Sequence, residues 1–370
     1  MFAESLFAPP TWLNRLAANP GFQKWASQIP LFRGLVRREG EVIFGILQGF
    51  VASQVLTTLV ELRILHQLME GPATPAKLGL GAGLSPENME KLLRAGAALG
   101  LLRQARGGRY GLTRMGAAIT GAPGLEAMIL HNRALYADMA DPIALLRNDG
   151  ETQLAQFWPY VFSGDHATGD VAERYSDLMA QSQIMVAQDT LRMVSFRGTR
   201  RLLDVGGGFG VFLQEVLSAH PKIEGHLFDL PGVVATAAER LAVSPVADRV
   251  TVTGGNFQQD AFPSGADTIS LIRVLYDHQD ATVANLLAKA YETLPPGGRL
   301  IISEPMGGAK RPDPACDVYF AFYTLAMGTG TLRTSQRIAE LCQAAGFADM
   351  RIPKAPRPFI SSAVVCHKPG

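Results

Sequence analysis

Residues 202–210 read Leu-Leu-Asp-Val-Gly-Gly-Gly-Phe-Gly, a short apolar run that ends in an acid and a cluster of glycines. A helix-like segment follows over residues 211–220, and the next apolar run, residues 225–229, closes on Asp229. Glycines let a backbone turn sharply and approach a ligand closely, because no Cβ stands in the way. An acid at the end of the second strand is placed to accept both hydroxyls of a ribose. The stretch therefore predicts a site for a nucleotide-type cofactor.

The spacing of the glycines indicates which cofactor this is. A dinucleotide site has the pattern G-x-G-x-x-G, whereas the glycines here are Gly206, Gly208 and Gly210, with Val211 after them. Asp204 stands two residues before the first of these, where an acid would repel a pyrophosphate but suits the cationic end of S-adenosylmethionine. The pattern favours S-adenosylmethionine over a dinucleotide, and the alternative is a tight strand-to-helix turn without a ligand.

Composition excludes several classes of protein. The chain has 370 residues, of which 47% are hydrophobic and 18% charged, so two domains with large cores are expected. The net charge of +1 gives no reason to expect a nucleic-acid partner. The three cysteines share no short spacing, so we expect neither a disulfide framework nor a metal site. Because no basic start followed by an apolar core opens the chain, we expect a cytoplasmic protein.

The N-terminal segment has a composition of its own. Its first forty residues mix aromatic and aliphatic side chains with lysine and arginine. This mixture suits an arm packed on a partner subunit or a weak contact with a membrane surface, besides ordinary packing. Residues 42–60 are the most apolar stretch, but glutamine, serine and threonine interrupt it and charges flank it closely. A buried or interface helix is therefore expected there rather than a membrane span.

Residues 41–195 read as helices with little strand. Ser85 is a candidate N-cap, and a short hairpin with a turn at residues 107–108 follows the helix that it begins. A helix followed by a small hairpin is the outline of a winged helix. The helix that would enter DNA balances Lys91 and Arg94 against two glutamates, whereas a phosphate backbone requires a basic face. We therefore expect this module to dimerise and not to bind nucleic acid.

From about residue 198 apolar runs alternate with helix-like segments, which is typical of an α/β fold with a parallel, doubly wound sheet. The apolar runs span residues 201–205, 225–229, 249–253, 267–275 and 299–303. Residues 347–352 and 359–367 read as two further strands joined by a proline-containing loop. A closing antiparallel hairpin is not expected of a plain dinucleotide-binding fold.

Several motifs occur together in an order that resembles one family. They are residues 204–208, 228–231, 255–257, 273–277, 294–298 and 303–305. The chain is similar over nearly its whole length to small-molecule, S-adenosylmethionine-dependent O-methyltransferases of the caffeate/hydroxyneurosporene type. This resemblance implies a homodimer with an N-terminal winged-helix dimerisation domain and a C-terminal class I methyltransferase domain.

The resemblance also implies a domain plan and an acceptor. Residues 1–118 would form the arm and the dimerisation domain, residues 119–197 a helical connector that lines the substrate pocket, and residues 198–370 the cofactor-binding domain. Residues 271–278 and 317–330 look most like family members that methylate a hydroxylated carotenoid in photosynthetic bacteria. An enzyme similar to the bacteriochlorophyllide C-20 methyltransferase is one alternative, and a cofactor-binding winged-helix protein without methyl transfer is another. A carotenoid enzyme would lie in the cytoplasm, peripheral to the photosynthetic membrane.

Nine residues are expected to bind the cofactor. Asp229 would accept the ribose hydroxyls, and Asn256 and Phe257 would lie near the adenine. The full set is Asp204, Gly206, Gly208, Gly210, Asp229, Leu230, Asn256, Phe257 and Arg273.

Catalysis is expected from Tyr276, Asp277 and His278, where the chain departs from the family. The family's usual motif is Leu-His-Asp-Trp with histidine as the base, and here the histidine position is Tyr276. Glu304 matches one of two supporting glutamates, and the other falls near Leu332 and is missing. No side chain can fully deprotonate an aliphatic tertiary alcohol before transfer, so loss of the base fits an alcohol acceptor, for which positioning dominates.

Structural alternatives exist for each of these side chains. Tyr276 either hydrogen-bonds the acceptor or packs beside the cofactor, and His278 either takes the proton or lies at a helix start. Asp277 and Asp280 are also candidates to cap a helix that begins near residue 281. The aromatic and methionine-rich run over residues 319–327 either lines an apolar pocket or belongs to the core. Residues 131–141 and the aromatic residues of 157–162 are candidates for the opposite wall.

Overall fold

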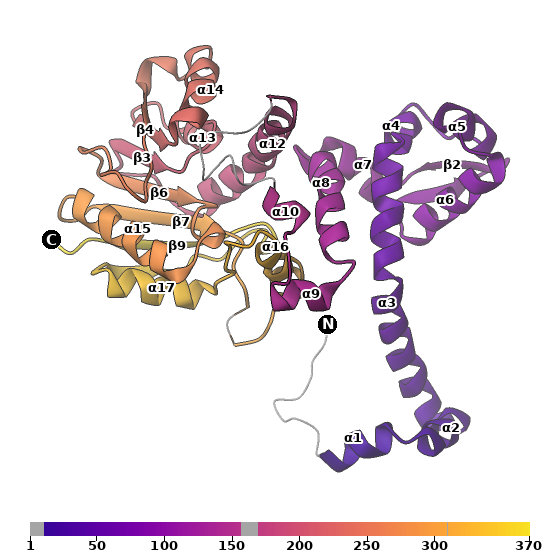
Figure 1. The fold of residues 1–370 in the computed structure, drawn as a ribbon. Helices are drawn as coiled ribbons and strands as arrows, with labels where there is room; N and C mark the ends of the chain where they lie inside the picture. Colours follow the sequence, from indigo (N-terminus) through magenta and orange to yellow (C-terminus); the bar gives the residue numbers. More distant parts are fainter. Residues whose placement is uncertain (1–10, 157–168, 309) are drawn as a thin grey trace. The chain divides into compact units, whose positions relative to one another are not determined.

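The computed structural model describes residues 11–156, 169–308 and 310–370, and the chain divides into two compact units, Met1–Thr120 and Gly121–Gly370 (Figure 1). The division falls two residues from the expected end of the dimerisation domain. Helices of the expected connector cluster with the sheet of the second unit. The two units are described in turn.

The first unit is helical apart from one hairpin. Its elements are α1 (Thr11–Ala17), α2 (Pro20–Gln28), α3 (Pro30–Glu61), α4 (Ile64–Met69), α5 (Pro75–Ala82), α6 (Pro86–Ala98), β1 (Leu102–Ala105), β2 (Arg109–Leu112) and α7 (Arg114–Gly121). Ser85 caps α6 as predicted, because its side chain accepts a hydrogen bond from the Asn88 N–H at 3.2 Å. Gly107 and Gly108 turn the hairpin with φ of +72° and +67°. The helix-then-hairpin order predicted from the sequence is confirmed.

Helix α3 is the longest element of the first unit and joins two groups of helices at its ends (Figure 1). By length and composition alone it could cross a membrane. Its last turn, with Leu59 and Val60, is instead buried in the core of the unit. Further toward its N-terminus α3 exposes an uncharged apolar stripe, which consists of Val42, Ile43, Phe44, Ile46, Leu47, Phe50 and Val51. An exposed apolar stripe of this kind marks an interaction surface.

The second unit begins with helices that precede its sheet. These are α8 (Leu125–Asp138), α9 (Pro142–Arg147), α10 (Gln153–Gln156) and α12 (Gly169–Met193). The strands are β3 (Arg201–Val205), β4 (Glu224–Asp229), β5 (Val250–Gly254), β6 (Thr268–Ile272), β7 (Arg299–Glu304), β8 (Ala348–Arg351) and β9 (Ser362–His367). They form one sheet in the order β5-β4-β3-β6-β7-β9-β8, in which β3 to β7 are parallel and β9 is antiparallel to both of its neighbours. The predicted doubly wound sheet with a closing antiparallel hairpin is confirmed.

Helices cover both faces of this sheet. They include α13 (Val211–Ala219), α14 (Pro231–Ala242), α15 (Asp280–Thr293) and α17 (Ser335–Ala344), whereas α16 (Ala321–Ala326) packs with α8, α9 and α10. One apolar core packs α12, α13 and α14 on one face, and a second packs α15 and α17 on the other. Because consecutive strand residues point to opposite faces, Leu202 belongs to the first core and Leu203 to the second.

One predicted strand is shorter than expected. The apolar run over residues 267–275 suggested a single strand, but β6 ends at Ile272 because Arg273 adopts a left-handed conformation with φ of +58°. The chain then forms a 3₁₀ turn, η2 (Leu275–Asp277). A non-glycine residue in this conformation is strained and is found most often at functional sites.

We predict that the apolar stripe of α3 forms the dimer interface. Ile46→Asp/Phe50→Asp should convert the dimer to a monomer in light scattering at micromolar concentration, because association would bury unpaired carboxylates. Both positions are about three-quarters exposed in the single chain, at 75% and 73%, so the monomer itself should fold normally. Leu80→Asp, at an 88% exposed position on α5, is the matched control. A double variant that stays dimeric would contradict this assignment.

Candidate active site

The glycine loop leaves the carboxyl end of β3, which lies inside the sheet between β4 and β6. Gly206, Gly208 and Gly210 all have positive φ, of +67°, +57° and +78°. A Cβ on Gly206 would lie 2.9 Å from a methyl group of Val274, and one on Gly207 would lie 2.5 Å from the Asp204 carboxylate. The loop therefore needs glycine both for its conformation and for its close approach to neighbouring chain.

Asp229, at the end of β4, holds this loop in place. Its Oδ2 accepts a hydrogen bond from the Gly208 N–H at 2.7 Å, and its Oδ1 accepts one from the Leu230 N–H at 2.7 Å. Burial raises the pKa of Asp229, and these two backbone hydrogen bonds lower it. Each carboxylate oxygen has a further lone pair, so the side chain can brace the loop and still accept a hydroxyl.

Asp204 is fully buried beneath the same loop. Its Oδ1 accepts a hydrogen bond from the Ser270 hydroxyl of β6 at 2.6 Å, whereas Oδ2 is buried without a hydrogen-bond partner among the described residues. Burial raises the pKa of Asp204 to about 7, and the Ser270 hydrogen bond opposes that shift. A buried carboxylate oxygen with free acceptor capacity, next to a loop with no side chains, fits the cationic part of S-adenosylmethionine.

The loop after β5 carries Asn256 and Phe257. The Asn256 side chain accepts a hydrogen bond from the Gln258 N–H at 2.9 Å, and the Asn256 N–H donates to the Asp260 carboxylate at 2.7 Å. Lys289 of α15 donates to the carbonyls of Phe257, Gln258 and Asp260 at 2.8, 3.0 and 2.9 Å. Sequence analysis did not predict this role, because a lysine on an amphipathic helix is usually an ordinary surface charge.

The His278 ring packs edge-on against the Phe257 ring, with centroids 5.3 Å apart. Burial lowers the pKa of His278 to about 4, and nearby Arg333 adds to that shift. The imidazole is therefore neutral at physiological pH. Its ring therefore lies against Phe257, a residue expected beside the adenine.

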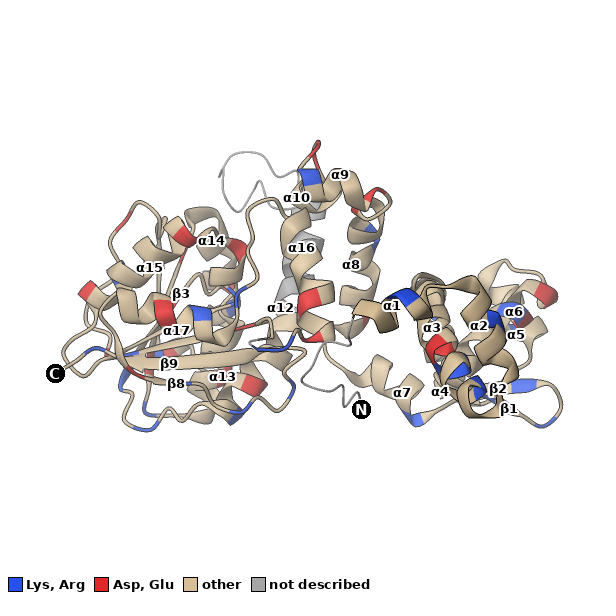
Figure 2. Ribbon diagram, turned by 90° about the horizontal axis from the view of Figure 1, so that it is seen from below, with Lys and Arg blue, Asp and Glu red and all other residues tan. Residues whose placement is uncertain are grey.

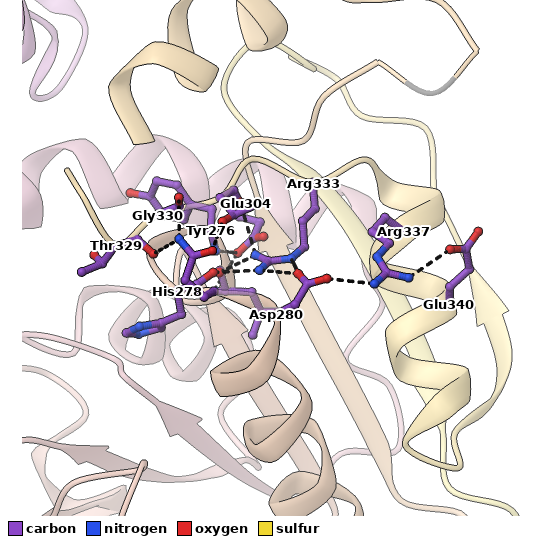
Figure 3. A network of polar contacts seen from close by, with 12 residues as sticks. Tyr276, His278, Asp280, Glu304, Thr329, Gly330, Arg333, Arg337 and Glu340 are labelled. Atoms are coloured by element: carbon purple, nitrogen blue, oxygen red, sulfur yellow. Dashed lines mark hydrogen bonds and ion pairs between the residues drawn. The ribbon is translucent and has the colours of Figure 1, made fainter. Parts of the chain in front are cut away.

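The backbone of the η2 turn is held from two sides (Figure 3). On one side the buried Glu304 of β7 accepts hydrogen bonds through Oε2 from the N–H groups of Leu275 and Tyr276, at 3.0 and 3.1 Å. Burial raises the pKa of Glu304 to about 7, opposed by the Tyr276 N–H hydrogen bond, Arg333 and the Leu275 N–H hydrogen bond. The family resemblance implied a glutamate that supports the catalytic base at this position, whereas the contacts of Glu304 in this structure are with the backbone of the turn.

On the other side, Arg333 satisfies the carbonyls of the turn. Its guanidinium donates to the carbonyls of Leu275 and His278, both at 2.8 Å, and forms an ion pair with Asp280 at 2.7 Å. Asp280 also pairs with Arg337, and the chain of charges ends at Glu340 (Figure 3). Asp280 thus holds two arginines, and the suggestion that it caps α15 is wrong, because the N-cap is Gln279 with no side-chain bond.

Arg273 contacts both α12 and the η2 turn. The sequence assigned it to the cofactor, but its guanidinium donates to the Ser182 hydroxyl of α12 at 2.9 Å and to the Tyr276 hydroxyl at 3.3 Å. Its charge also lowers the pKa of His131 on α8, after the larger effect of burial, to about 4. Arg273 therefore belongs to a polar cluster with the expected catalytic tyrosine.

The aromatic run near α16 pairs its hydroxyl groups with α8. The Tyr323 hydroxyl lies 3.0 Å from His131 Nε2, and the Tyr319 hydroxyl donates to the Asn132 side chain at 2.5 Å. The same cluster is apolar and closely packed, with Leu135, Leu145, Leu154, Ala326 and Met327 buried around Tyr323. The run is thus partly core. Residues 157–162, the other expected wall, lie outside the described residues. In the described ranges, no three His, Cys, Asp or Glu side chains form a metal-binding group.

The chain matches two known domain families and is similar in sequence to several known proteins. The O-methyltransferase domain matches residues 136–348, and the O-methyltransferase dimerisation domain matches residues 44–121. The chain is 50% identical to the demethylspheroidene O-methyltransferase of Cereibacter sphaeroides, over 96% of this chain and 94% of that protein. It is 47% identical to the protein of the same name from Rhodobacter capsulatus, over 95% of this chain and 88% of that protein.

Two solved structures with a similar fold are also methyltransferases. The human N-acetylserotonin methyltransferase, solved with S-adenosylmethionine, superposes with a TM-score of 0.78 at 25% identity, over 90% of this chain and 98% of that one. CalO1, a methyltransferase of calicheamicin biosynthesis solved with S-adenosylhomocysteine, superposes with a TM-score of 0.77 at 26% identity, with the same coverage. The cofactor is therefore S-adenosylmethionine.

We predict that affinity for S-adenosylmethionine depends on ionisation of Asp204. A cationic ligand needs the carboxylate, so calorimetry should show affinity falling about tenfold from about pH 8 to pH 6, given a pKa of about 7. Asp204→Asn should bind weakly at every pH and lose this dependence. A pH profile that the substitution leaves unchanged would contradict the role of Asp204.

The stability of the free protein provides an independent check on Asp204. Folding raises the pKa of Asp204 from 3.8 to about 7, so the folded chain holds this proton more tightly than the unfolded chain does. The free energy of unfolding should therefore fall as pH rises between about 4 and 7. Asp204→Asn should make that fall smaller, and the remainder comes from groups such as Glu304, whose pKa is also raised to about 7.

We also predict that Glu304 is required to hold the η2 turn. Glu304→Ala leaves two buried N–H groups without an acceptor, so the free energy of unfolding should fall by about 2–5 kcal/mol in urea. Glu304→Gln keeps a carbonyl acceptor and should lose less than half as much. Glu340→Ala removes a half-exposed carboxylate at the other end of the charge chain and should change stability by less than about 0.5 kcal/mol. Equal effects of the two alanine variants would exclude this role.

Proposed function

Because this chain belongs to the S-adenosylmethionine-dependent O-methyltransferase family, we propose that it methylates the hydroxyl group of a hydroxylated carotenoid. That it is an O-methyltransferase follows from its family, and its dimerisation domain supports a homodimer. The carotenoid acceptor is our extension to this chain of the name that two relatives carry, at 50% and 47% identity. One observation carries the proposal, namely a buried tyrosine where the family has a histidine base.

Tyr276 is suited to bind a hydroxyl group and not to deprotonate one. Burial raises its pKa, opposed by the nearby Arg273, so the phenol keeps its proton at physiological pH. The guanidinium of Arg273 donates to the phenol oxygen at 3.3 Å, and the phenol also hydrogen-bonds the Asp277 side chain, a contact that an acceptor hydroxyl would replace. A phenol held in this way can donate to an alcohol oxygen and fix its position.

The acceptor proton needs a destination, and Asp277 supplies one. Asp277 is buried, and its Oδ1 has no hydrogen-bond partner among the described residues. Burial raises its pKa well above 3.8, opposed by Arg273. A carboxylate with a raised pKa is a stronger base than an ordinary one, which suits it to take a proton late in the reaction. His278, with a pKa near 4 and its ring on Phe257, is the weaker candidate.

The reaction then proceeds by in-line displacement. S-adenosylmethionine supplies an electrophilic methyl group on a positively charged sulfur. Tyr276 and Asp277 hold the acceptor oxygen, whose lone pair forms the new C–O bond while the C–S bond electrons return to sulfur. The hydroxyl proton passes to the Asp277 carboxylate as the oxygen becomes positive. Orientation of this kind can lower the activation free energy by about 7–11 kcal/mol. This effect is larger than that of a general base, which typically raises the rate by about 10²–10⁴-fold.

The proposal is tested by the choice of acceptor. Purified protein with methyl-labelled S-adenosylmethionine should transfer label to a hydroxycarotenoid dispersed in detergent, with the product identified by mass spectrometry as its methyl ether. Caffeate and catechol test the phenol chemistry of the wider family, and a bacteriochlorophyllide tests transfer to carbon. Label on one of these, with none on hydroxycarotenoids, would overturn the acceptor. A chain that binds the cofactor but labels no acceptor would support the non-catalytic alternative.

We predict that Tyr276 matters more than His278 for turnover. Tyr276→Phe removes the group that positions the acceptor, so the rate of methyl transfer at saturating cofactor should fall by at most about 10²–10⁴-fold. His278→Ala should lower that rate by a smaller factor. Both variants should bind S-adenosylmethionine with near-native affinity. Abolished activity in His278→Ala with no effect of Tyr276→Phe would identify His278 as an essential base and reverse this order.

A further inference from the structure

The segment that precedes the dimerisation domain is strongly basic. We call residues 11–38, which comprise α1, α2 and the first turns of α3, the basic arm. The arm carries five basic residues and no acidic one: Arg15, Lys24, Arg33, Arg37 and Arg38. All five are exposed, and Figure 2 shows basic residues in blue on α1 and α2. Since the net charge of the whole chain is only +1, the rest of it is net acidic.

The same arm exposes large apolar side chains. Trp12 is 61% exposed, Trp25 51% and Leu31 81%. The Trp25 ring lies between Phe22 and Phe32, with centroid distances of 5.5 and 5.8 Å, so three aromatic rings gather where α2 meets α3. Apart from this contact the arm is hardly packed inside the unit, because α1 buries no residue and α2 buries only Ala26.

We infer that the basic arm binds the surface of an anionic phospholipid bilayer and lies in the plane of the interface. Exposed tryptophan and leucine beside lysine and arginine, with no acid among them, is the composition of a segment that lies on a membrane. Tryptophan rings favour the level of the lipid headgroups, and basic side chains are attracted to their phosphates. The helices α1 and α2 each carry a tryptophan and a basic residue, and the start of α3 adds three arginines.

The charge of the arm distinguishes it from the dimer interface. The apolar stripe of α3 is uncharged, and most of it lies inside the matched dimerisation domain, which begins at residue 44. The basic arm ends before that residue. Arg37 pairs with Glu41, just beyond the arm, at 3.6 Å, but two arms packed on each other around a twofold axis would still bring together ten cations and no acid of their own. An anionic lipid surface offsets that charge, whereas a second copy of the arm adds to it.

A surface contact also fits the chain better than a span. Although α3 is long and apolar enough to cross a bilayer, its N-terminal part contains Arg33, Arg37 and Arg38 and its last turn is buried in the first unit. Spanning would require those arginines to cross or the buried turn to unfold. If the proposed function holds, the arm also brings the enzyme to the phase in which an apolar carotenoid dissolves.

Vesicle flotation of the full-length protein tests the inference without any acceptor. The protein should float with vesicles of phosphatidylglycerol and phosphatidylcholine, bind pure phosphatidylcholine weakly, and be released by high salt. Arg33→Glu/Arg38→Glu should weaken partition roughly thirtyfold or more, since each basic residue contributes about fivefold near an anionic surface. Lys77→Glu/Arg106→Glu makes the same charge change at exposed positions outside the arm and should float as the parent does.

Fluorescence of Trp25 locates the contact. With the other two tryptophans replaced by phenylalanine, Trp25 emission should shift to the blue on vesicles and be quenched by brominated lipid. Trp25→Ser/Leu31→Ser should abolish flotation while leaving the dimer intact in light scattering.

Three results would overturn the inference: no flotation on anionic vesicles, equal loss in the two charge variants, or a dimer that dissociates when only the arm is changed. Protein that stays on the vesicles through high salt and alkaline carbonate would indicate a span instead. Because vesicle binding is measured without cofactor or acceptor, failure of the proposed methyl transfer would leave this result unaffected.

Discussion

The buried contact between Glu304 and the backbone of the η2 turn is the constraint on which the candidate active site depends. A carboxylate with no exposure to water is costly, and here it is stabilised by two N–H groups that have no helix or sheet partner. Arg333 satisfies carbonyls of the same turn from the other side and links it to α15 through Asp280. With its donors and acceptors both held, the turn presents Tyr276 in one fixed position.

The fixed turn separates two groups of side chains that are adjacent in sequence. Tyr276 points to Arg273 and the α12 side of the unit, whereas His278, two residues on, packs on Phe257 beside the cofactor residues. The left-handed backbone at Arg273 ends β6 early enough for this turn to form. One strained residue and one buried acid thereby direct the side chains of a single motif to two places in the unit. Under the proposed function, one is the acceptor side and the other the cofactor side, and Tyr276 positions the acceptor where the family resemblance implied a histidine base.

The sequence predicted the parts of the site that depend on local pattern. Glycine spacing and strand-end acids located Asp204, the loop and Asp229, because backbone conformation restricts those positions to few residue types. It did not predict Arg333, Lys289 or the direction of Arg273, because their roles depend on partners 29–91 residues away. The apolar run over residues 267–275 concealed the end of β6, since hydrophobicity continues through the turn. The exposure of the N-terminal arm could not be predicted either, because amphipathic helices that pack in a core have similar sequences.

A crystal structure with S-adenosylhomocysteine and a hydroxycarotenoid would test most directly whether this turn positions the acceptor without a histidine base. We expect the acceptor hydroxyl within hydrogen-bonding distance of the Tyr276 phenol and the Asp277 carboxylate. The His278 ring should remain edge-on against Phe257. An imidazole rotated away from Phe257 and hydrogen-bonded to the acceptor oxygen, with Tyr276 out of reach, would contradict the account.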